Sequence, residues 1–247
     1  MKMEKNLSTD KMEEYHRRMD RRIDEYLAQL KTEREENIWR RRWHQLISYE
    51  HFEQMMIASA ENIMMKRGTY AQYVVDDANG DMMIQLYYHF IGDQSKCKWN
   101  VDKGLFLYGK IGCGKTLFMK AYLNVVCAMC GLLVKYIHAK EIYDLIKSDE
   151  NKKLLITSAL FIDELGRESL EINEFGNKIR PIQDLFAYRY EFGSRTFCTS
   201  NFSPSALEGK NDNGVQKGYG KYVRTRMEEM MNIIEMPGEN RRPSYTL

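Results

Sequence analysis

The sequence predicts an α/β fold in which a parallel β-sheet is flanked by helices. Three observations indicate it. Apolar runs alternate with helical segments after residue 103, a glycine-rich turn joins the first run to a helix, and another run ends in two acids. Strands that alternate with helices form parallel sheets, and such sheets bind ligands at the carboxyl ends of their strands. The 247 residues suffice for one such domain and a smaller module.

Five apolar runs are expected to be the strands of this sheet, because they are short and bounded by turn or helix signals. The expected strands are 104–108, 132–138, 159–162, 195–200 and 232–236. The expected helices between them are 116–130, 141–147, 175–192 (beginning near Pro181), 203–207 and 221–231. The Gly- and Asn-rich stretch 209–220 is expected to be a mobile loop.

The glycine-rich turn reads GKIGCGKT from Gly109 to Thr116, which matches the phosphate-binding P-loop pattern Gly-x-x-x-x-Gly-Lys-Thr. Its glycines let the backbone direct N–H groups inward, and the helix that begins near Lys115 directs its positive dipole end at the same place. Lys115 is expected to bind the terminal phosphates, and the Thr116 hydroxyl to bind Mg²⁺. A glycine turn without a ligand is disfavoured, since strand, lysine and threonine are in register. The residues expected to bind the nucleotide are Gly109, Lys110, Ile111, Gly112, Cys113, Gly114, Lys115, Thr116 and Leu117.

The acidic run reads LFIDE, and a buried strand here would deliver Asp163 and Glu164 at its carboxyl end. Asp163 is expected to hold Mg²⁺ opposite Thr116. Glu164 is expected to polarise the attacking water as a general base. The alternative is an acid-rich turn at the end of a strand. One strand downstream of a P-loop, the catalytic interpretation is favoured.

Two further segments could complete a nucleotide-hydrolysing site. Asn201 follows the next strand, where its amide could position the attacking water, although an Asx-type turn would explain the same residue. Arg224 and Arg226 fall on a helix after the mobile loop. A helix-borne arginine could reach the phosphates of a neighbouring subunit as an arginine finger. The alternative is solvated surface charge.

The composition is that of a globular protein without a strong electrostatic bias. Hydrophobic residues make up 43% and charged residues 29%, and the net charge is only +2. Any nucleic-acid contact would therefore be a local patch. No apolar run is long enough to span a bilayer and no secretory signal is recognisable, so we expect a cytoplasmic protein without a membrane partner.

Cys127 and Cys130 form a C-x-x-C pair. We interpret them as thiols on a helix face, with a zinc or redox site as the alternative.

The N-terminal region is expected to be a helical module. Between Asp10 and Ile47, the apolar residues Met12, Met19 and Tyr26 recur every seven positions, as in a short coiled coil or a helical hairpin. Trp39 and Trp43 flank basic residues. This pattern would suit a partner-docking or nucleic-acid face, but a helix whose tryptophans pack inward while the arginines stay in solvent is favoured. Further helices are expected at 52–66 and 81–91.

The P-loop, the acidic motif FIDELG, and the segments RYEFGSRTFCTSN, YGKYVRTRM and GENRR together resemble the DnaC/DnaI-type replicative helicase loaders and the related IstB transposition helpers, both AAA+ ATPases. The resemblance covers roughly 104–242. It implies an AAA+ fold with a five-stranded sheet, ATP and Mg²⁺ as cofactors, ATP hydrolysis, and homo-oligomers that form on ATP binding. It also implies a replicative helicase and single-stranded DNA as partners. By the same resemblance Asn201 is the first sensor, Arg226 the arginine finger and Arg242 the second sensor, with Arg241 in a neighbouring register.

The expected organisation is a partner-docking module at 1–68, a connector and helix at 69–103, and an AAA+ ATPase domain at 104–247. Residues 1–68 match no recognised sequence motif, so the helicase partner is inferred from the ATPase part.

An IstB-like helper has the same ATPase motifs, and it would differ only in its N-terminal module and partner. A small-molecule P-loop kinase with 209–226 as its lid is a third hypothesis, and Glu164 argues against it. A fourth is an assembly protein that binds ATP but scarcely hydrolyses it. The sequence leaves open the partner, the oligomer size, any DNA sequence preference and the genomic origin.

Overall fold

The computed structural model describes residues 2–41, 44–77, 79–174, 177–209, 211–212, 215–216 and 218–241. It divides into two compact units at the boundary between residues 43 and 44. The first unit contains one helix, α1 (Lys2–Arg41), and its continuity excludes the helical hairpin that the sequence allowed. Residues 34–43, which include Trp39 and Trp43, lie outside the described side chains. In the described part of the chain, no helix is both long and apolar enough to cross a membrane.

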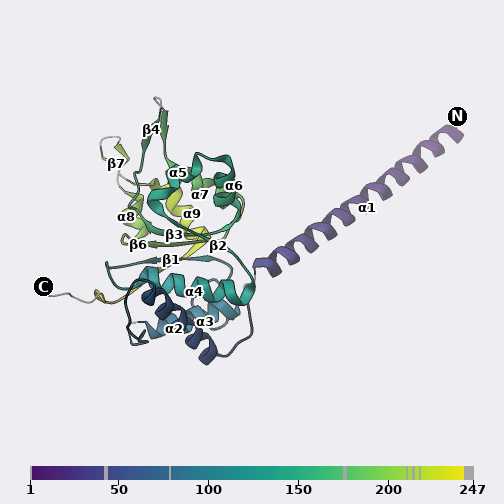
Figure 1. The fold of residues 1–247 in the computed structure, drawn as a ribbon. Helices are drawn as coiled ribbons and strands as arrows, with labels where there is room; N and C mark the ends of the chain where they lie inside the picture. Colours follow the sequence, from purple (N-terminus) through teal and green to yellow (C-terminus); the bar gives the residue numbers. More distant parts are fainter. Residues whose placement is uncertain are drawn as a thin grey trace. The chain divides into compact units, whose positions relative to one another are not determined.

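The second unit is built around a five-stranded parallel sheet with strand order β2-β3-β6-β1-β9 (Figure 1). All five expected strands are present, and the predicted fold class is confirmed. β3 continues through Leu165, so Asp163 and Glu164 belong to the strand. The strands are β1 (Gly104–Tyr108), β2 (Val134–His138), β3 (Ala159–Leu165), β6 (Thr196–Ser200) and β9 (Met231–Glu235).

Helices cover both faces of the sheet (Figure 1). On one face lie α2 (Tyr49–Met65), α3 (Gly80–Ile91) and α4 (Lys115–Cys130). The other face carries the 3₁₀ turn η1 (Ala139–Glu141) and the helices α5 (Ile142–Ile146), α6 (Asp149–Thr157), α7 (Pro181–Glu191), α8 (Pro204–Glu208) and α9 (Gly220–Met230). The interior strand β1, which lies between β6 and β9, is therefore buried on both sides, as its uninterrupted apolar sequence requires.

Three elements were not expected from the sequence. Helix α6 is preceded by Ser148, whose hydroxyl accepts a hydrogen bond from Asn151 N and so caps the helix. This cap marks the start of a helix that has no long apolar pattern in the sequence. A hairpin of β4 (Ile172–Glu174) and β5 (Asn177–Ile179) occupies part of the segment expected to be helical. Two-residue strands β7 (Asn211–Asp212) and β8 (Val215–Gln216) form another hairpin in the stretch expected to be a mobile loop.

Helix α2 is part of the sheet-containing unit. Phe52, Met56 and Ala60 are buried, and the Phe52 ring lies 5.4 Å from Phe90 and 6.4 Å from Tyr122 of α4, centroid to centroid. The structural boundary thus precedes α2, whereas the sequence suggested boundaries near 68 and 103. Apolar contacts between helices distant in sequence decide this point, and a local pattern does not reveal them. A docking role for residues 1–68 stays a prediction.

Arg189 of α7, the first residue of the RYEFGSRTFCTSN segment, has a structural role in positioning two strands of the sheet. Its side chain is fully buried and donates to the carbonyls of Leu155, Ser158 and Arg195 and to the Thr196 hydroxyl. Burial lowers the pKa of this guanidinium to about 10. The carbonyls it binds belong to the end of α6 and to the residues that precede β3 and β6. Arg189 therefore fixes where these two strands begin, and through them where their carboxyl ends lie.

Candidate nucleotide-binding site

A cavity of about 560 Å³ opens beside the carboxyl ends of β3 and β6. The P-loop residues from Ile111 to Leu117 line it, together with Glu164 and Asn201. Of the other predicted residues, Gly109, Lys110, Asp163 and Arg226 lie outside the lining, and Arg242 lies outside the described residues. Parallel strands place their carboxyl ends at one edge of the sheet, and this is why residues from distant segments meet here.

At two positions of the P-loop, both the backbone conformation and a close neighbouring group require glycine. Gly109 has a φ of 152° and Gly112 a φ of 86°, conformations that residues with a Cβ rarely adopt. A Cβ on Gly109 would lie 2.5 Å from the Met236 carbonyl oxygen, and one on Gly112 would lie 2.0 Å from Asn240 Oδ1. The segment that follows β9 therefore packs directly on the loop, and only glycine permits that approach.

Lys115 is held inside the loop. It is 6% exposed, and its Nζ donates to the carbonyl oxygens of Gly109 at 2.9 Å and Lys110 at 2.7 Å. The side chain of Lys110 forms an ion pair with Glu239 instead. The loop thus positions one ammonium group beside the N-terminus of α4, where the helix dipole adds to its positive potential.

Asp163 connects three elements behind the cavity. Its Oδ1 accepts from the Thr116 hydroxyl at 2.7 Å and from the Thr199 hydroxyl at 2.5 Å. Lys120 Nζ lies 3.8 Å from its other carboxylate oxygen. The Thr199 hydroxyl also accepts from Glu164 N at 3.1 Å. One threonine of β6 therefore fixes both acids, although sequence reasoning singled out Asn201 in the same TSN segment.

Glu164 sits at an irregular point of β3. The pairing of β3 with β6 shifts register between Ile162 and Leu165, and Glu164 has a φ of 57°. It is the non-glycine residue with positive φ in the described part of the chain, and such strain concentrates at functional sites. Its Oε2 lies 3.2 Å from His138 Nε2 and 3.5 Å from Arg167 Nε. These two partners were not predicted, because neither His138 nor Arg167 belongs to a motif.

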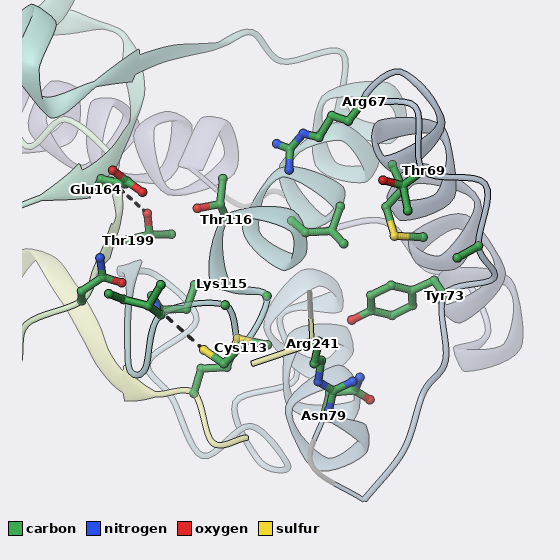
Figure 2. A pocket seen from close by; sticks show the side chains of 18 of the residues that line it. Arg67, Thr69, Tyr73, Asn79, Cys113, Lys115, Thr116, Glu164, Thr199 and Arg241 are labelled. Atoms are coloured by element: carbon green, nitrogen blue, oxygen red, sulfur yellow. Dashed lines mark hydrogen bonds between the residues drawn. The ribbon is translucent and has the colours of Figure 1, made fainter. Parts of the chain in front are cut away.

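The opposite wall of the cavity comes from the segment between α2 and α3. Figure 2 shows Thr116, Glu164 and Thr199 at one end of the cavity and Tyr73 and Arg241 at the other. The guanidinium of Arg241 lies 2.8 Å from an Asp76 carboxylate oxygen, and this contact raises its pKa. Burial raises the pKa of Tyr73 to about 12, so the phenol is neutral. Sequence reasoning treated this segment as a connector.

The two arginines of α9 differ in their surroundings. Arg224 forms ion pairs with Glu208 at 2.7 Å and Glu228 at 2.8 Å. The Arg226 guanidinium carbon instead lies 3.6 Å from the Tyr222 ring centroid. Neither arginine lines the cavity of its own chain.

The donor set suits a magnesium ion bound together with phosphates. The Thr116 hydroxyl and the Asp163 carboxylate lie side by side, and Mg²⁺ commonly takes one or two protein ligands along with phosphate oxygens and water. Within the described residues, no cluster of three or more His, Cys, Asp or Glu could hold a metal alone. This gives no support to a zinc site at Cys127 and Cys130. Burial raises the pKa of both thiols, which also disfavours a reactive pair.

The sequence and the fold were compared with known proteins. No family model matches the chain. The replicative helicase loader DnaI of Bacillus subtilis (strain 168) is 27% identical over an aligned length of 188 residues, and this alignment covers 70% of this chain and 58% of that protein. The chain thus spans less than two thirds of the relative's length. A crystal structure of DnaI superposes with a TM-score of 0.50 at 23% identity, covering 76% of this chain and 93% of that one. A protein of Streptococcus pyogenes serotype M3 described as a primosome component has a TM-score of 0.50 at 23% identity, with coverages of 69% and 85%.

Proposed function

Since this chain is a distant homologue of the DnaI/DnaC-type helicase loaders with the fold of an AAA+ ATPase, we propose that it binds and hydrolyses ATP to load or release a replicative helicase on single-stranded DNA. The single observation that carries the proposal is the cavity at the carboxyl ends of the strands. There, a P-loop lysine and threonine face a strained glutamate, and the threonine bonds to a second acid. The homology alone would suggest the family but not the chemistry.

In the proposed complex, the triphosphate lies along Gly112 to Thr116. Lys115 exchanges its bonds to the loop carbonyls for bonds to phosphate oxygens, because a phosphate offers a charged acceptor. Bound Mg²⁺, held by Thr116 and Asp163, would neutralise phosphate charge during the reaction. The nucleoside then points along the rest of the cavity toward Tyr73.

We assign hydrolysis to Glu164 as the general base for water, with Asn201 orienting that water. Thr199 supports this geometry, since its hydroxyl bonds both to Asp163 and to the backbone of Glu164. Arg226 would act on the nucleotide of a neighbouring copy, because it does not line its own cavity. ATP binding would thereby favour a homo-oligomer.

The binding step is tested by calorimetry with ATP and Mg²⁺. Lys115→Ala should abolish the binding heat, whereas Lys98→Ala should bind like the original chain, because its ammonium pairs with Asp81 on the surface. Folded protein that gives no heat with ATP and Mg²⁺ would contradict the proposal at its base. Circular dichroism of both variants controls for folding.

The partner is tested by ATP turnover with and without single-stranded DNA and the cognate helicase. We expect both to change the rate, and we expect the helicase to be retained by the immobilised full chain. An IstB-like helper would retain a transposase instead. In either case, we expect residues 1–68 to select the partner. Turnover without any acceptor metabolite would exclude a small-molecule kinase. A cytoplasmic location follows from the proposed role in replication.

A further inference from the structure

Arg226 is held between two tyrosine rings. Its guanidinium carbon lies 3.6 Å from the ring centroid of Tyr222 and 5.1 Å from that of Tyr190. Tyr222 precedes Arg226 by one turn of α9, and Tyr190 lies near the end of α7. Both distances are within the range in which an aromatic face attracts a cation. The rings are 61% and 40% exposed, so this arrangement is at the surface of the chain.

The Tyr190 ring is itself fixed. Its hydroxyl donates to Glu229 Oε2 at 2.5 Å, and this contact raises the pKa of the phenol. Glu229 lies on α9 three residues after Arg226, but its carboxylate accepts a hydrogen bond from Tyr190 and forms no ion pair with Arg226 in the described part of the chain. In the described part of the chain, no carboxylate forms an ion pair with Arg226. Arg224, two residues earlier, has two such partners, so the two arginines of α9 differ in whether the chain itself neutralises them.

One nitrogen of Arg226, Nη1, is buried and has no hydrogen-bond partner among the described residues. A buried donor without an acceptor is uncommon and costs stability. Aromatic rings satisfy the faces of a guanidinium but accept none of its in-plane hydrogen bonds. Because Nη1 is closed to solvent in the single chain while Arg226 as a whole is half-buried, an anion from outside the chain would bind the accessible part of this side chain, and a phosphate offers several oxygens to a planar guanidinium.

We infer that Tyr222 and Tyr190 are positioning residues that orient Arg226 toward the nucleotide of a neighbouring copy. This inference rests on the proposed ATPase function and deepens it. A free arginine side chain samples many rotamers, and ordering it at the moment of assembly would cost free energy. Stacking on two rings restricts those rotamers in advance, so that the assembled site forms with its cation already in place.

The test uses mixed subunits so that the two sides of the shared site can be changed separately. The acceptor subunit carries Arg226→Ala, which keeps its own P-loop and Glu164. The donor subunit carries Glu164→Gln, which keeps Arg226 but does not hydrolyse its own ATP. Turnover of ATP above the sum of the separate variants then reports Arg226 of the donor acting on the acceptor's nucleotide.

Tyrosine changes are then added to the donor alone. Tyr222→Leu should reduce the restored rate roughly tenfold and Tyr190→Leu by a smaller factor, in line with the strength of a cation–aromatic contact. Tyr222→Phe should keep the rate, because it keeps the ring. Tyr188→Leu is the matched control: Tyr188 lies on α7, two residues before Tyr190, with 41% exposure, but its ring lies near the Lys152 ammonium. Donor thermal midpoints and ATP affinities should be equal across the set.

Each outcome separates the two proposals. If the Glu164→Gln and Arg226→Ala mixture restores no turnover, the role of Arg226 in a neighbour's site is wrong. If it restores turnover and Tyr222→Leu donors perform like unmodified donors, only the positioning role is wrong. A faster rate with Tyr222→Leu would overturn it as well, because the rings would then restrain Arg226 instead of orienting it. Equal losses for Tyr188→Leu and Tyr222→Leu would point to a general surface effect and contradict it too.

Discussion

The candidate nucleotide cavity and the surface formed by Arg226, Tyr222 and Tyr190 both belong to the sheet-containing unit. They differ in whether their polar groups find partners within the chain. At the cavity, Lys115, Thr116 and Thr199 bond to the P-loop backbone or to Asp163, which lies behind the lining. On the face of α9, Arg226 has aromatic neighbours and a buried nitrogen for which the described residues supply no acceptor. The groups at the cavity thus bond to one another within a single chain, whereas the neighbouring copy that we propose would supply the acceptor for Arg226.

This difference suggests which step of the proposed ATPase cycle would depend on the association of neighbouring copies. Groups that satisfy each other inside one chain hold their geometry without a partner, which suits nucleotide binding. A cation whose acceptor is missing changes its environment on assembly, which suits a rate that depends on the neighbour. We therefore expect binding to depend on the cavity alone, and hydrolysis to depend on both regions.

Glu164→Gln should produce the largest effect on turnover. We expect steady-state phosphate release to fall about 10²- to 10⁴-fold, because the amide cannot take a proton from water. ATP affinity should change by less than about threefold, and the assembled state should persist. Glu150→Gln, an exposed carboxylate in the first turn of α6, is the control. Equal phosphate release from both variants would mean that the cavity does not supply the base.

Thr199→Val tests whether one hydroxyl fixes both acids. The valine leaves Glu164 N without its acceptor and removes one donor from Asp163 Oδ1. We expect turnover to fall about tenfold and the free energy of unfolding to fall by roughly 1–3 kcal/mol, the usual range for an unsatisfied buried group. Turnover kinetics and chemical denaturation measure the two effects. Thr199→Ser should restore both, and a valine variant that behaves like the original chain would show that the acids hold themselves.

Arg241→Ala tests the other wall of the cavity. Its ion pair with Asp76 is partly exposed, with side-chain exposures of 34% and 44%, so solvent weakens it. We expect the dissociation constant for ATP to rise about two- to fivefold, measured by calorimetry. If the ion pair carries the effect, Asp76→Asn should cause a similar rise, and the double variant should be no worse than either single one. Additive effects would indicate that Arg241 contacts the nucleotide directly.

Stability below pH 6.5 should show the smallest effect under ordinary assay conditions. His89 is fully buried, with its Nε2 donating to the Lys103 carbonyl and its Nδ1 accepting from the Tyr122 hydroxyl. Burial, together with nearby Arg195, lowers its pKa to about 3, below its ordinary value of 6.5. The unfolded chain therefore binds a proton first as the pH falls, and stability present above pH 6.5 is lost between pH 6.5 and 3.

The expected loss is roughly 1 kcal/mol of unfolding free energy for each pH unit below 6.5. Urea unfolding at pH 7.5 and 5.5 measures it. His89→Gln should flatten this dependence, even if it lowers stability at pH 7.5. A slope that the variant leaves unchanged would assign the acid sensitivity to another group. The comparison between the cavity and the surface formed by Arg226, Tyr222 and Tyr190 is therefore best made above pH 6.5.

Much of the fold was visible in the sequence because its signals are local. Each strand of the sheet is a compact apolar run, and the P-loop combines glycines, a lysine and a threonine within eight residues. The strand order was not visible, since register between distant segments leaves no local pattern. Helix α6 and the β4–β5 hairpin were missed for a related reason, because they are short and depend on a cap or a partner strand.

The amino-acid sequence by itself identified the P-loop pattern, the two acids and the arginines of α9 as candidates, because each proposed role demands particular residue types at fixed spacing. Only the tertiary structure decided that Thr199 binds both acids, that His138 and Arg167 surround Glu164, and that the segment before α3 closes the cavity. It also decided that Arg226 lies between two tyrosines. These contacts join residues from separate elements, and their strength depends on distances that exist only after the sheet and its helices have packed.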